Sequence, residues 1–313
     1  MSYRIGVDLG GTNIAVGIVD GAQRIVGRAS VPTDPSRGAS GVADDIVRSV
    51  ALALDAAGAA IGGCTAVGVG SPGNCDMENG VVRNAHNLGW ESVPLCALLR
   101  ERMGLPAFVG NDADCAALGE VVAGAARGCG SALLITLGTG VGGGLVIGGK
   151  IFSGHRTLGG EFGHMCIAMD GEACSCGERG CWEAYASATA LIRQARAAAA
   201  AHPESALART DKLDGRSIYA AAAAGDAAAC AVTARYAEYV GIGLVNLMNA
   251  LFPEVILLGG GVAGAGEALL APVREYAAAH FFVRDAALLP PILPAALGND
   301  AGIIGAAALG GKV

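Results

Sequence analysis

The stretch I-G-V-D-L-G-G-T-N at residues 5–13 is followed by I-A-V-G-I-V at residues 14–19 and by the pair Asp20–Gly21. Apolar runs separated by glycine and closed by an Asp-Gly turn predict a β-hairpin. A shift of 128 positions aligns this stretch with L-L-I-T-L-G-T-G-V-G-G-G-L-V-I from residue 133, which Gly148–Gly149 closes in turn. The repeat predicts two similar halves, and two such glycine turns that face each other can hold a polyphosphate.

Three glycine clusters follow apolar strands, at residues 10–11, 138–140 and 259–261. Glycine lets the backbone approach a phosphate and present its amide groups, although glycines also serve simply to turn hairpins. There is no P-loop signature, and the first cluster does not open a βαβ helix as a dinucleotide fingerprint would. We expect a nucleotide site that includes Asp8, Gly10, Gly11, Thr12, Asn13, Gly138, Thr139, Gly140, Gly260 and Gly261. The Asp8 carboxylate suits Mg²⁺ bound through water.

Residues 161–183 contain E-F-G-H and then C-S-C-G-E-R-G-C-W-E. One imidazole and three thiols, from His164, Cys174, Cys176 and Cys181, are in the ratio of a closed structural zinc site. Free cysteines also act as small buried hydrophobes, which suits the other seven cysteines better than these three in a glycine-rich loop. Glu161 and Glu183 flank the predicted zinc ligands, so the metal is expected to shape a binding pocket.

The segment G-N-D-A-D at residues 110–114 follows an expected strand. An Asp at the end of a strand can accept the proton of a substrate hydroxyl, as phosphoryl transfer requires, which makes Asp112 the candidate general base. Two alternatives stay open at this point. Asn or Asp before a helix commonly serves as its N-cap, and Asp114 is a rival base.

The composition favours a globular protein of about two domains, with 313 residues, 53% of them hydrophobic, and 50 glycines. A net charge of −7 argues against a nucleic-acid partner. Residues 131–149 carry no charge, but seven glycines argue against a membrane span, and we expect a cytoplasmic protein. Alternating strands and helices predict an α/β fold. Helices are expected over residues 41–60, 113–125, 184–201, 217–224, 226–251 and 300–309, and strands over 66–70, 106–109 and 255–258.

Together these motifs resemble the ROK family of sugar kinases, most closely its bacterial glucokinases. The resemblance covers nearly the whole chain, and the cysteine loop together with E-F-G-H is its most specific part. The other matching motifs are D-L-G-G-T at 8–12, G-S-P-G at 70–73, N-L-G-W at 87–90, G-N-D-A at 110–113, L-G-T-G-V-G-G-G at 137–144 and L-G-G-G-V at 258–262.

The resemblance implies an actin-like, duplicated two-domain fold of the ribonuclease H type. Its smaller N-terminal domain would comprise residues 1–118 and the C-terminal helix at 299–313, and its larger domain residues 119–298, with the zinc loop and the second phosphate loop. The implied reaction is the ATP-dependent phosphorylation of the glucose 6-hydroxyl, a step of glycolysis, with Asp112 as the base. The implied sugar-binding residues are Gly73, Asn87, Asn111, Asp112, Glu161, His164 and Glu183. The implied cofactors are ATP, Mg²⁺ and structural Zn²⁺.

Relatives of this kind also phosphorylate N-acetylmannosamine or other hexoses, and some are sugar-sensing regulators that carry a DNA-binding segment before the first glycine motif. Only seven residues precede Asp8 here, so the enzyme is the expected class. The expected partners are a sugar and ATP, with no nucleic acid and no membrane, and the expected assembly is a homodimer or homotetramer.

Overall fold

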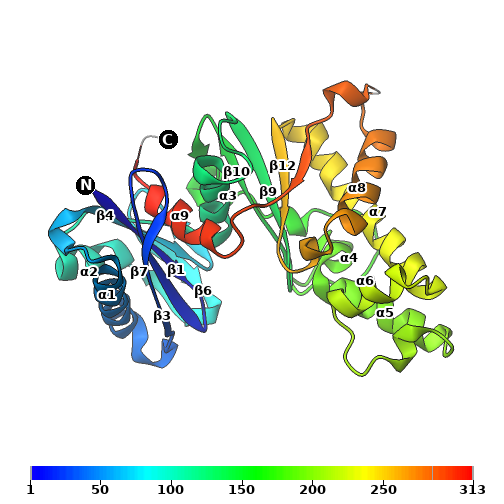
Figure 1. Ribbon diagram of the computed structural model, residues 1–313, viewed down its shortest axis with the longest axis horizontal. Coiled ribbons are helices and arrows are strands. Elements are labelled where there is room, and N and C mark those ends of the chain that lie inside the picture. Colours follow the sequence, from blue (N-terminus) through cyan, green and yellow to red (C-terminus); the bar gives the residue numbers. More distant parts are fainter. Residues whose placement is uncertain (1, 284, 312–313) are drawn as a thin grey trace. The chain divides into compact units, whose positions relative to one another are not determined.

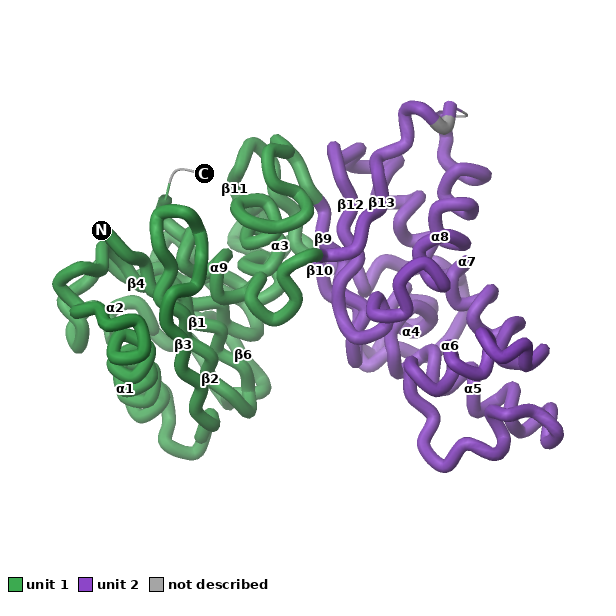
Figure 2. The backbone as a smooth tube through the Cα atoms, in the orientation of Figure 1, with its two compact units in different colours: residues 1–132, 144–160, 296–313 green, residues 133–143, 161–295 purple. Residues whose placement is uncertain are grey.

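The computed structural model describes residues 2–283 and 285–311. Its contacts divide the chain into two compact units (Figure 2). The first comprises residues 1–132, 144–160 and 296–313, and the second comprises residues 133–143 and 161–295. The domain boundary after residue 118 stays a prediction, because units defined by packing need not coincide with the domains that act in catalysis.

The first unit is built on a five-stranded sheet of order β3-β2-β1-β4-β8 (Figure 1). The strands are β1 (Tyr3–Leu9), β2 (Asn13–Val19), β3 (Ile25–Pro32), β4 (Cys64–Ser71) and β8 (Ala107–Asn111). The first three strands pair antiparallel, while β4 pairs parallel with both β1 and β8. Apolar side chains of β1, β2 and β4 are almost fully buried and form the core of this unit.

In the described part of this unit the α-helices are α1 (Gly38–Ala57), α2 (Leu95–Met103), α3 (Asp112–Ala123) and α9 (Asp300–Ala308). The C-terminal helix α9 packs directly against β1 and β4 and against α3. A Cβ atom at Gly6 would lie 1.9 Å from the carbonyl oxygen of Ile303, and one at Gly68 would lie 1.8 Å from that of Ala306. Glycine at these strand positions therefore allows the backbone of α9 to rest on the sheet.

A second, three-stranded sheet of order β5-β6-β7 also belongs to the first unit. Its strands are β5 (Asn74–Asp76), β6 (Val81–Ala85) and β7 (Trp90–Val93), which pair antiparallel.

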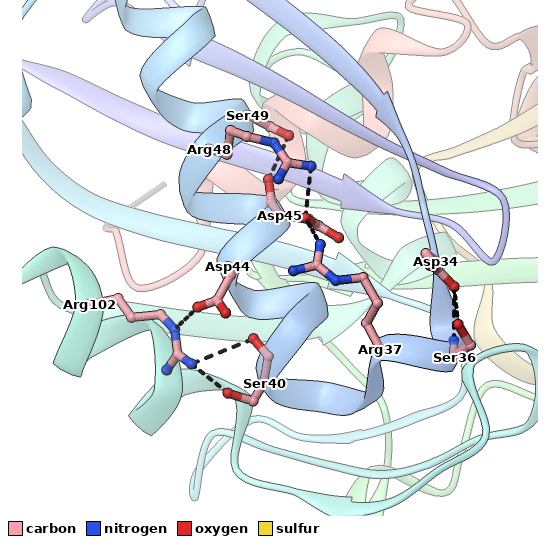
Figure 3. A network of polar contacts seen from close by, with 9 residues as sticks. All are labelled: Asp34, Ser36, Arg37, Ser40, Asp44, Asp45, Arg48, Ser49 and Arg102. Atoms are coloured by element: carbon pink, nitrogen blue, oxygen red, sulfur yellow. Dashed lines mark hydrogen bonds and ion pairs between the residues drawn. The ribbon is translucent and has the colours of Figure 1, made fainter.

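A polar network holds the N-terminal half of α1 (Figure 3). The Asp45 carboxylate is 2% exposed and pairs with Arg37 and, at 2.8 Å, with Arg48. The neighbouring Asp44 accepts a hydrogen bond of 2.7 Å from Nε of Arg102 on α2. The buried carboxylate is thus charge-compensated, as burial of a charge requires, and α1 is linked to α2.

The other large sheet has the order β11-β10-β9-β12-β13. Its strands are β9 (Ser131–Leu137), β10 (Val141–Ile147), β11 (Lys150–Ile151), β12 (Val255–Gly259) and β13 (Ile292–Pro294). The bounds of β9 and β10 equal those of β1 and β2 plus 128, and the two strand orders match position by position. The predicted duplication is therefore confirmed at the level of strands.

The helices of the second unit are α4 (Glu183–Ala186), α5 (Ala188–Ala201), α6 (Gly215–Ala223), α7 (Ala227–Leu251) and α8 (Glu267–His280). The long helix α7 packs against the other four. Within residues 2–283 and 285–311 no single helix is both long and apolar enough to cross a membrane, and α6 and α7 qualify only as a pair bent by 119°.

Three details differ from the sequence predictions. The single helix expected over residues 184–201 is broken at Ser187, whose side chain caps α5 by accepting a hydrogen bond from the amide of Ala190. The helix expected over residues 41–60 begins at Gly38 and ends at Ala57, because Gly58 adopts the left-handed conformation of a helix C-cap. The first expected strand ends at Leu9, and the turn at residues 20–21 leads into β3, which was not predicted.

Candidate active site

Parallel strands gather the predicted residues of the first unit at one edge of its sheet. Asp8 pairs with Gly70 across β1 and β4, and β8 ends beside β4 at Asn111. The carboxyl ends of parallel strands share an edge, which is where ligands bind in α/β sheets. Asn111 Nδ2 donates a hydrogen bond of 3.0 Å to the carbonyl oxygen of Gly73. The structure therefore brings Asp8, Gly73, Asn111 and the adjoining Asp112 to the same edge.

The start of α3 separates the roles of three neighbouring polar residues. Asn111 is the N-cap, and its Oδ1 accepts hydrogen bonds from the amides of Ala113, at 2.9 Å, and Asp114, at 3.3 Å. The capping alternative is thus correct for Asn111. Asp112, the first residue of the helix, is exposed, whereas Asp114 is 7% exposed. Of the two rival bases, Asp112 is the carboxylate that an incoming hydroxyl can reach.

Asp8 gives this edge of the sheet an unfavourable concentration of negative charge. Burial, and then the charge of Asp112, raise the pKa of Asp8 from its usual value to about 6. Two neighbouring carboxylates repel each other when both are ionised, and a bound cation reduces this repulsion. The pair of carboxylates therefore suits a divalent cation of the oxygen-binding type, such as Mg²⁺.

The first glycine turn joins β1 to β2 and is braced by Thr33, the residue that follows β3. The amide of Gly10 donates to the carbonyl oxygen of Asn13 at 2.8 Å, and the hydroxyl of Thr33 donates to the Gly10 carbonyl at 2.8 Å. A Cβ atom at Gly11 would lie 3.1 Å from that of Asn87, so Asn87 lies against this turn. The role of Thr33 could not be predicted from the sequence, because Thr33 follows β3, the strand that was not predicted.

The second glycine turn joins β9 to β10 and is held by the start of α5. The amide of Gly138 donates to the carbonyl oxygen of Gly140 at 3.0 Å. From α5, the amide of Ala188 donates to the carbonyl oxygen of Gly138 at 2.7 Å. The hydroxyl of Thr189 donates to the carbonyl oxygen of Thr139 at 2.8 Å. With its carbonyl groups engaged by α5, the turn is fixed in one conformation.

The third glycine turn, after β12, lies beside the second within the same unit. Gly260 has a φ of +83°, and a Cβ atom there would be 2.5 Å from the carbonyl oxygen of Leu137. Only glycine fits this conformation and this approach. Nothing lies within 4 Å of the Cβ position of Gly261, which leaves that side of the turn open. The second and third turns thus form one glycine-rich surface.

The four predicted metal ligands come together in the loop that precedes α4. The ligand atoms of His164, Cys174, Cys176 and Cys181 all lie within 4.8 Å of one another. Cys176 Sγ and Cys181 Sγ are 3.7 Å apart, and Cys174 Sγ lies 3.8 Å from His164 Nδ1. All ten cysteines are free thiols, so the cluster is not a disulfide.

The geometry and chemistry of this cluster fit zinc. In a tetrahedral site with metal–sulfur bonds of about 2.3 Å, two sulfur ligands are about 3.8 Å apart, close to the separations found here. The backbone amide of Glu178 is the largest cause that lowers the pKa of the Cys176 thiol. Burial raises the pKa of Cys181 to about 12. A bound cation would favour the thiolate form of both residues.

The core of the second unit fixes the C-terminal end of residues 164–181, the segment with the four clustered residues, which we call the metal loop. Trp182, which follows the ligand Cys181, is fully buried and donates from Nε1 to the carbonyl oxygen of Tyr239 at 2.8 Å. Its indole ring lies on Gly243 of α7, where a Cβ atom would be 2.0 Å from Trp182 Cε2. The predicted ligand Cys181 is therefore followed directly by a residue that packs on α7.

Glu183 connects the metal loop to the second glycine turn. Its Oε2 accepts a hydrogen bond of 3.0 Å from the amide of Val141, and its Oε1 accepts one of 3.2 Å from the hydroxyl of Ser175. A cavity of about 400 Å³ is lined by residues of both segments, among them Thr139 and Cys174. Two expected functional elements thus adjoin within the second unit, and the exposed Glu161 belongs to the same unit.

Comparison with known proteins identifies the family. Residues 4–312 match the ROK family. The glucokinase of Halalkalibacterium halodurans is 40% identical, over 97% of this chain and 93% of its own length, and that of Streptomyces coelicolor is 38% identical, over 99% and 98%. The chain therefore belongs to the ROK family.

Solved structures agree with this assignment. The ROK hexokinase from Thermus thermophilus is 39% identical, with a TM-score of 0.80 over 97% of this chain and 96% of that chain. A ROK family glucokinase from Streptomyces griseus, solved in complex with glucose and AMPPNP, is 39% identical, with a TM-score of 0.79 over 98% and 99%. The expected actin-like, two-domain α/β fold is confirmed.

Proposed function

We propose that this chain is an ATP-dependent hexose kinase that phosphorylates the 6-hydroxyl of glucose. Glucokinases of the family support the proposal, with identities of 35–40% over nearly the whole chain. The observation that carries it in this structure is the exposed Asp112 at the start of α3, whose charge acts on the half-buried Asp8. An accessible carboxylate beside a candidate cation site is the arrangement that phosphoryl transfer to a hydroxyl requires.

In the proposed reaction, Asp112 accepts the proton of the sugar 6-hydroxyl as that oxygen attacks the γ-phosphorus of ATP. The bond between the γ-phosphorus and the bridging oxygen breaks, and ADP leaves. Asn111 is fixed by its bonds to the helix amides and to Gly73, so the adjoining Asp112 needs no rearrangement of the helix start. Positioning of this kind supplies much of the rate in phosphoryl transfer.

We assign the remaining sugar hydroxyls to the polar groups that the family resemblance implies. Asn111, the backbone of Gly73, Glu161, His164 and Glu183 would form hydrogen bonds to the sugar. A site whose carboxylates and amides form hydrogen bonds to a substrate hydroxyl rejects analogues that lack this hydroxyl, because the polar groups of the site are then left without a hydrogen-bond partner. Asn87, which lies against Gly11, is assigned to this set as well.

We assign the phosphates of ATP to the three glycine turns, together with Thr12 and Thr139. Asp8 would hold Mg²⁺ through water, and this ion would neutralise charge on the phosphates. Zinc, when bound, would fix the fold of the loop that carries His164 and Glu183. Because His164 presents Nδ1 to the cluster, its Nε2 is left to donate to a sugar hydroxyl. Assembly as a homodimer or homotetramer stays a prediction.

Phosphorus NMR of the product tests the proposed reaction directly. The protein with Mg-ATP and glucose should convert glucose to glucose 6-phosphate with matching formation of ADP. Phosphorylation of another hydroxyl, or release of phosphate from ATP without a sugar phosphate, would contradict the proposal.

A cysteine substitution tests the role of the metal loop. Cys176→Ser should lose bound zinc and raise the KM for glucose steeply, with a smaller effect on the KM for ATP. Cys230→Ser is the matched control, since this exposed cysteine lies on α7 outside the cluster. An unchanged glucose KM in a metal-free Cys176→Ser protein would show that the loop does not depend on zinc.

A further inference from the structure

Cys166 lies next to the metal cluster without belonging to it. It is exposed, follows His164 by two positions and is not among the four clustered ligands. Its backbone forms an isolated antiparallel bridge with that of the ligand Cys181, which is 2% exposed. Two hydrogen bonds flank the bridge, from Ile167 N to Gly180 O at 2.8 Å and from Trp182 N to Met165 O at 2.7 Å.

This bonding pattern defines the separation of the two cysteines. The flanking bonds leave Cys166 and Cys181 as a pair that exchanges no hydrogen bond of its own. In such antiparallel pairs the Cα atoms are about 4.5 Å apart and the side chains leave the same face. Disulfides need Cα atoms roughly 4.4–6.8 Å apart, so the backbone already meets that requirement. A rotation of the side chains would then be sufficient.

The residue before Cys181 leaves room for this rotation. Gly180 has a φ of +79°, and a Cβ atom there would lie 3.1 Å from Cys166 Sγ. The sulfur atom of Cys166 thus lies over a position without a side chain, immediately beside Cys181. The pair therefore combines an exposed thiol, Cys166, which an oxidant can reach, with a proposed metal ligand, Cys181.

We propose that Cys166 and Cys181 form a redox pair that couples oxidation to release of the metal. A hydroperoxide oxidises the Cys166 thiol to a sulfenic acid and is reduced to water or an alcohol. The Cys181 thiolate then attacks the sulfenic sulfur, a disulfide forms, and hydroxide leaves and takes up a proton as water. The metal loses one of its four ligands in this step. The inference rests on the zinc site of the proposed function.

The structure gives this oxidation a defined consequence. Cys181 is followed by the buried Trp182 and by Glu183, which bonds to both the metal loop and the second glycine turn. Release of the metal removes the cross-link between Cys181 and the distant ligand His164. The loop around the proposed sugar-binding residues then keeps its hydrogen bonds, among them the one from Ser175 to Glu183, but loses its metal cross-link, and affinity for the sugar falls. A dithiol reductant together with zinc restores the loop.

Peroxide treatment of the zinc-loaded protein tests the proposal by readouts independent of activity. Zinc release is followed with a chromophoric chelator, and the disulfide is located by peptide mapping without reduction. The wild type should release its zinc as one Cys166–Cys181 disulfide forms. Cys166→Ser should bind zinc normally but release it at least about tenfold more slowly. It lacks the thiol whose closeness to Cys181 speeds disulfide formation. Cys230→Ser, which removes another exposed cysteine, should behave like the wild type.

Two results would overturn the inference, and they are distinguishable. A disulfide between Cys176 and Cys181, whose sulfur atoms are 3.7 Å apart, with unchanged release in Cys166→Ser, would show that the ligands oxidise among themselves. That result would leave the metal site in place. Absence of zinc from the untreated protein would instead refute the zinc site and, with it, the redox pair.

Discussion

Replacement of Asp112 by Asn separates the catalytic role of this residue from its structural one. Asn keeps the size of the side chain, and its oxygen can still accept a hydrogen bond from the amide of Ala113, as Asp112 Oδ1 does at 2.8 Å. What it loses is the ability to take the sugar proton. A general base contributes about 10²- to 10⁴-fold in rate, or about 3 to 5 kcal/mol in the barrier. We expect kcat to fall by this factor and the KM values to change little.

The effect of Asp112→Asn on stability should be small, for reasons that the structure provides. A carboxylate at the first position of a helix gains about 0.3–1 kcal/mol from the helix dipole. This loss is partly offset, because the substitution also removes a negative charge that repels Asp8 and raises its pKa. The free energy of unfolding should therefore fall by less than about 1 kcal/mol. Denaturant titration monitored by circular dichroism measures it.

Asp114→Asn is the matched control, because Asp114 lies two residues further along the same helix and is 7% exposed. The buried carboxylate should matter to stability, by about 1–3 kcal/mol, and little to kcat. Retained kcat in Asp112→Asn, or a loss of kcat confined to Asp114→Asn in a folded protein, would refute the assignment of the base.

Two further predictions concern packing and pH. Gly243→Ala places a methyl group against Trp182, so the unfolding free energy should fall by about 1–3 kcal/mol. Because Trp182 follows the proposed ligand Cys181, the variant should also lose zinc to a chelator more easily than the wild type does. Unchanged zinc retention would show that this contact does not brace the metal loop. Arg28 lowers the pKa of Asp300 at the start of α9, so the ion pair adds stability above the unfolded-state pKa and loses it as pH falls through the folded-state pKa. Asp300→Asn should therefore reduce stability by about 1 kcal/mol or less at neutral pH and by nothing at pH values below both pKa values; a deficit independent of pH would contradict this reasoning.

The duplication and the metal cluster could be predicted because their signals are local. An apolar run, a glycine turn and a second apolar run within about 15 residues specify a hairpin, and both hairpins occur where the repeat placed them. The four predicted metal ligands lie within residues 164–181, so the loop can bring them together without any distant contact. The three thiols and one imidazole then favour zinc as the predicted metal.

The features that were missed depend on partners distant in sequence. β5, β6 and β7 have only three to five residues each, and their polar residues show no clear alternation. Such strands are stabilised by pairing rather than by intrinsic preference. The break at Ser187 was hidden in an alanine-rich run, where one hydroxyl caps α5 and the helix start supports the second glycine turn. The N-cap role of Asn111 was open from the sequence, and the exposure of Asp112 became visible only in the structure.

A comparison of kcat/KM among hexoses tests the central claim most directly. The protein is assayed for ADP release with Mg-ATP and glucose, N-acetylmannosamine, N-acetylglucosamine, allose, mannose or fructose. The account predicts a value for glucose at least about tenfold above the others, equal to about 1.4 kcal/mol in transition-state binding. A higher value for an N-acetyl sugar would contradict the assignment of glucose. Absence of turnover with every sugar, in a zinc-loaded and folded protein, would contradict the proposed kinase activity itself.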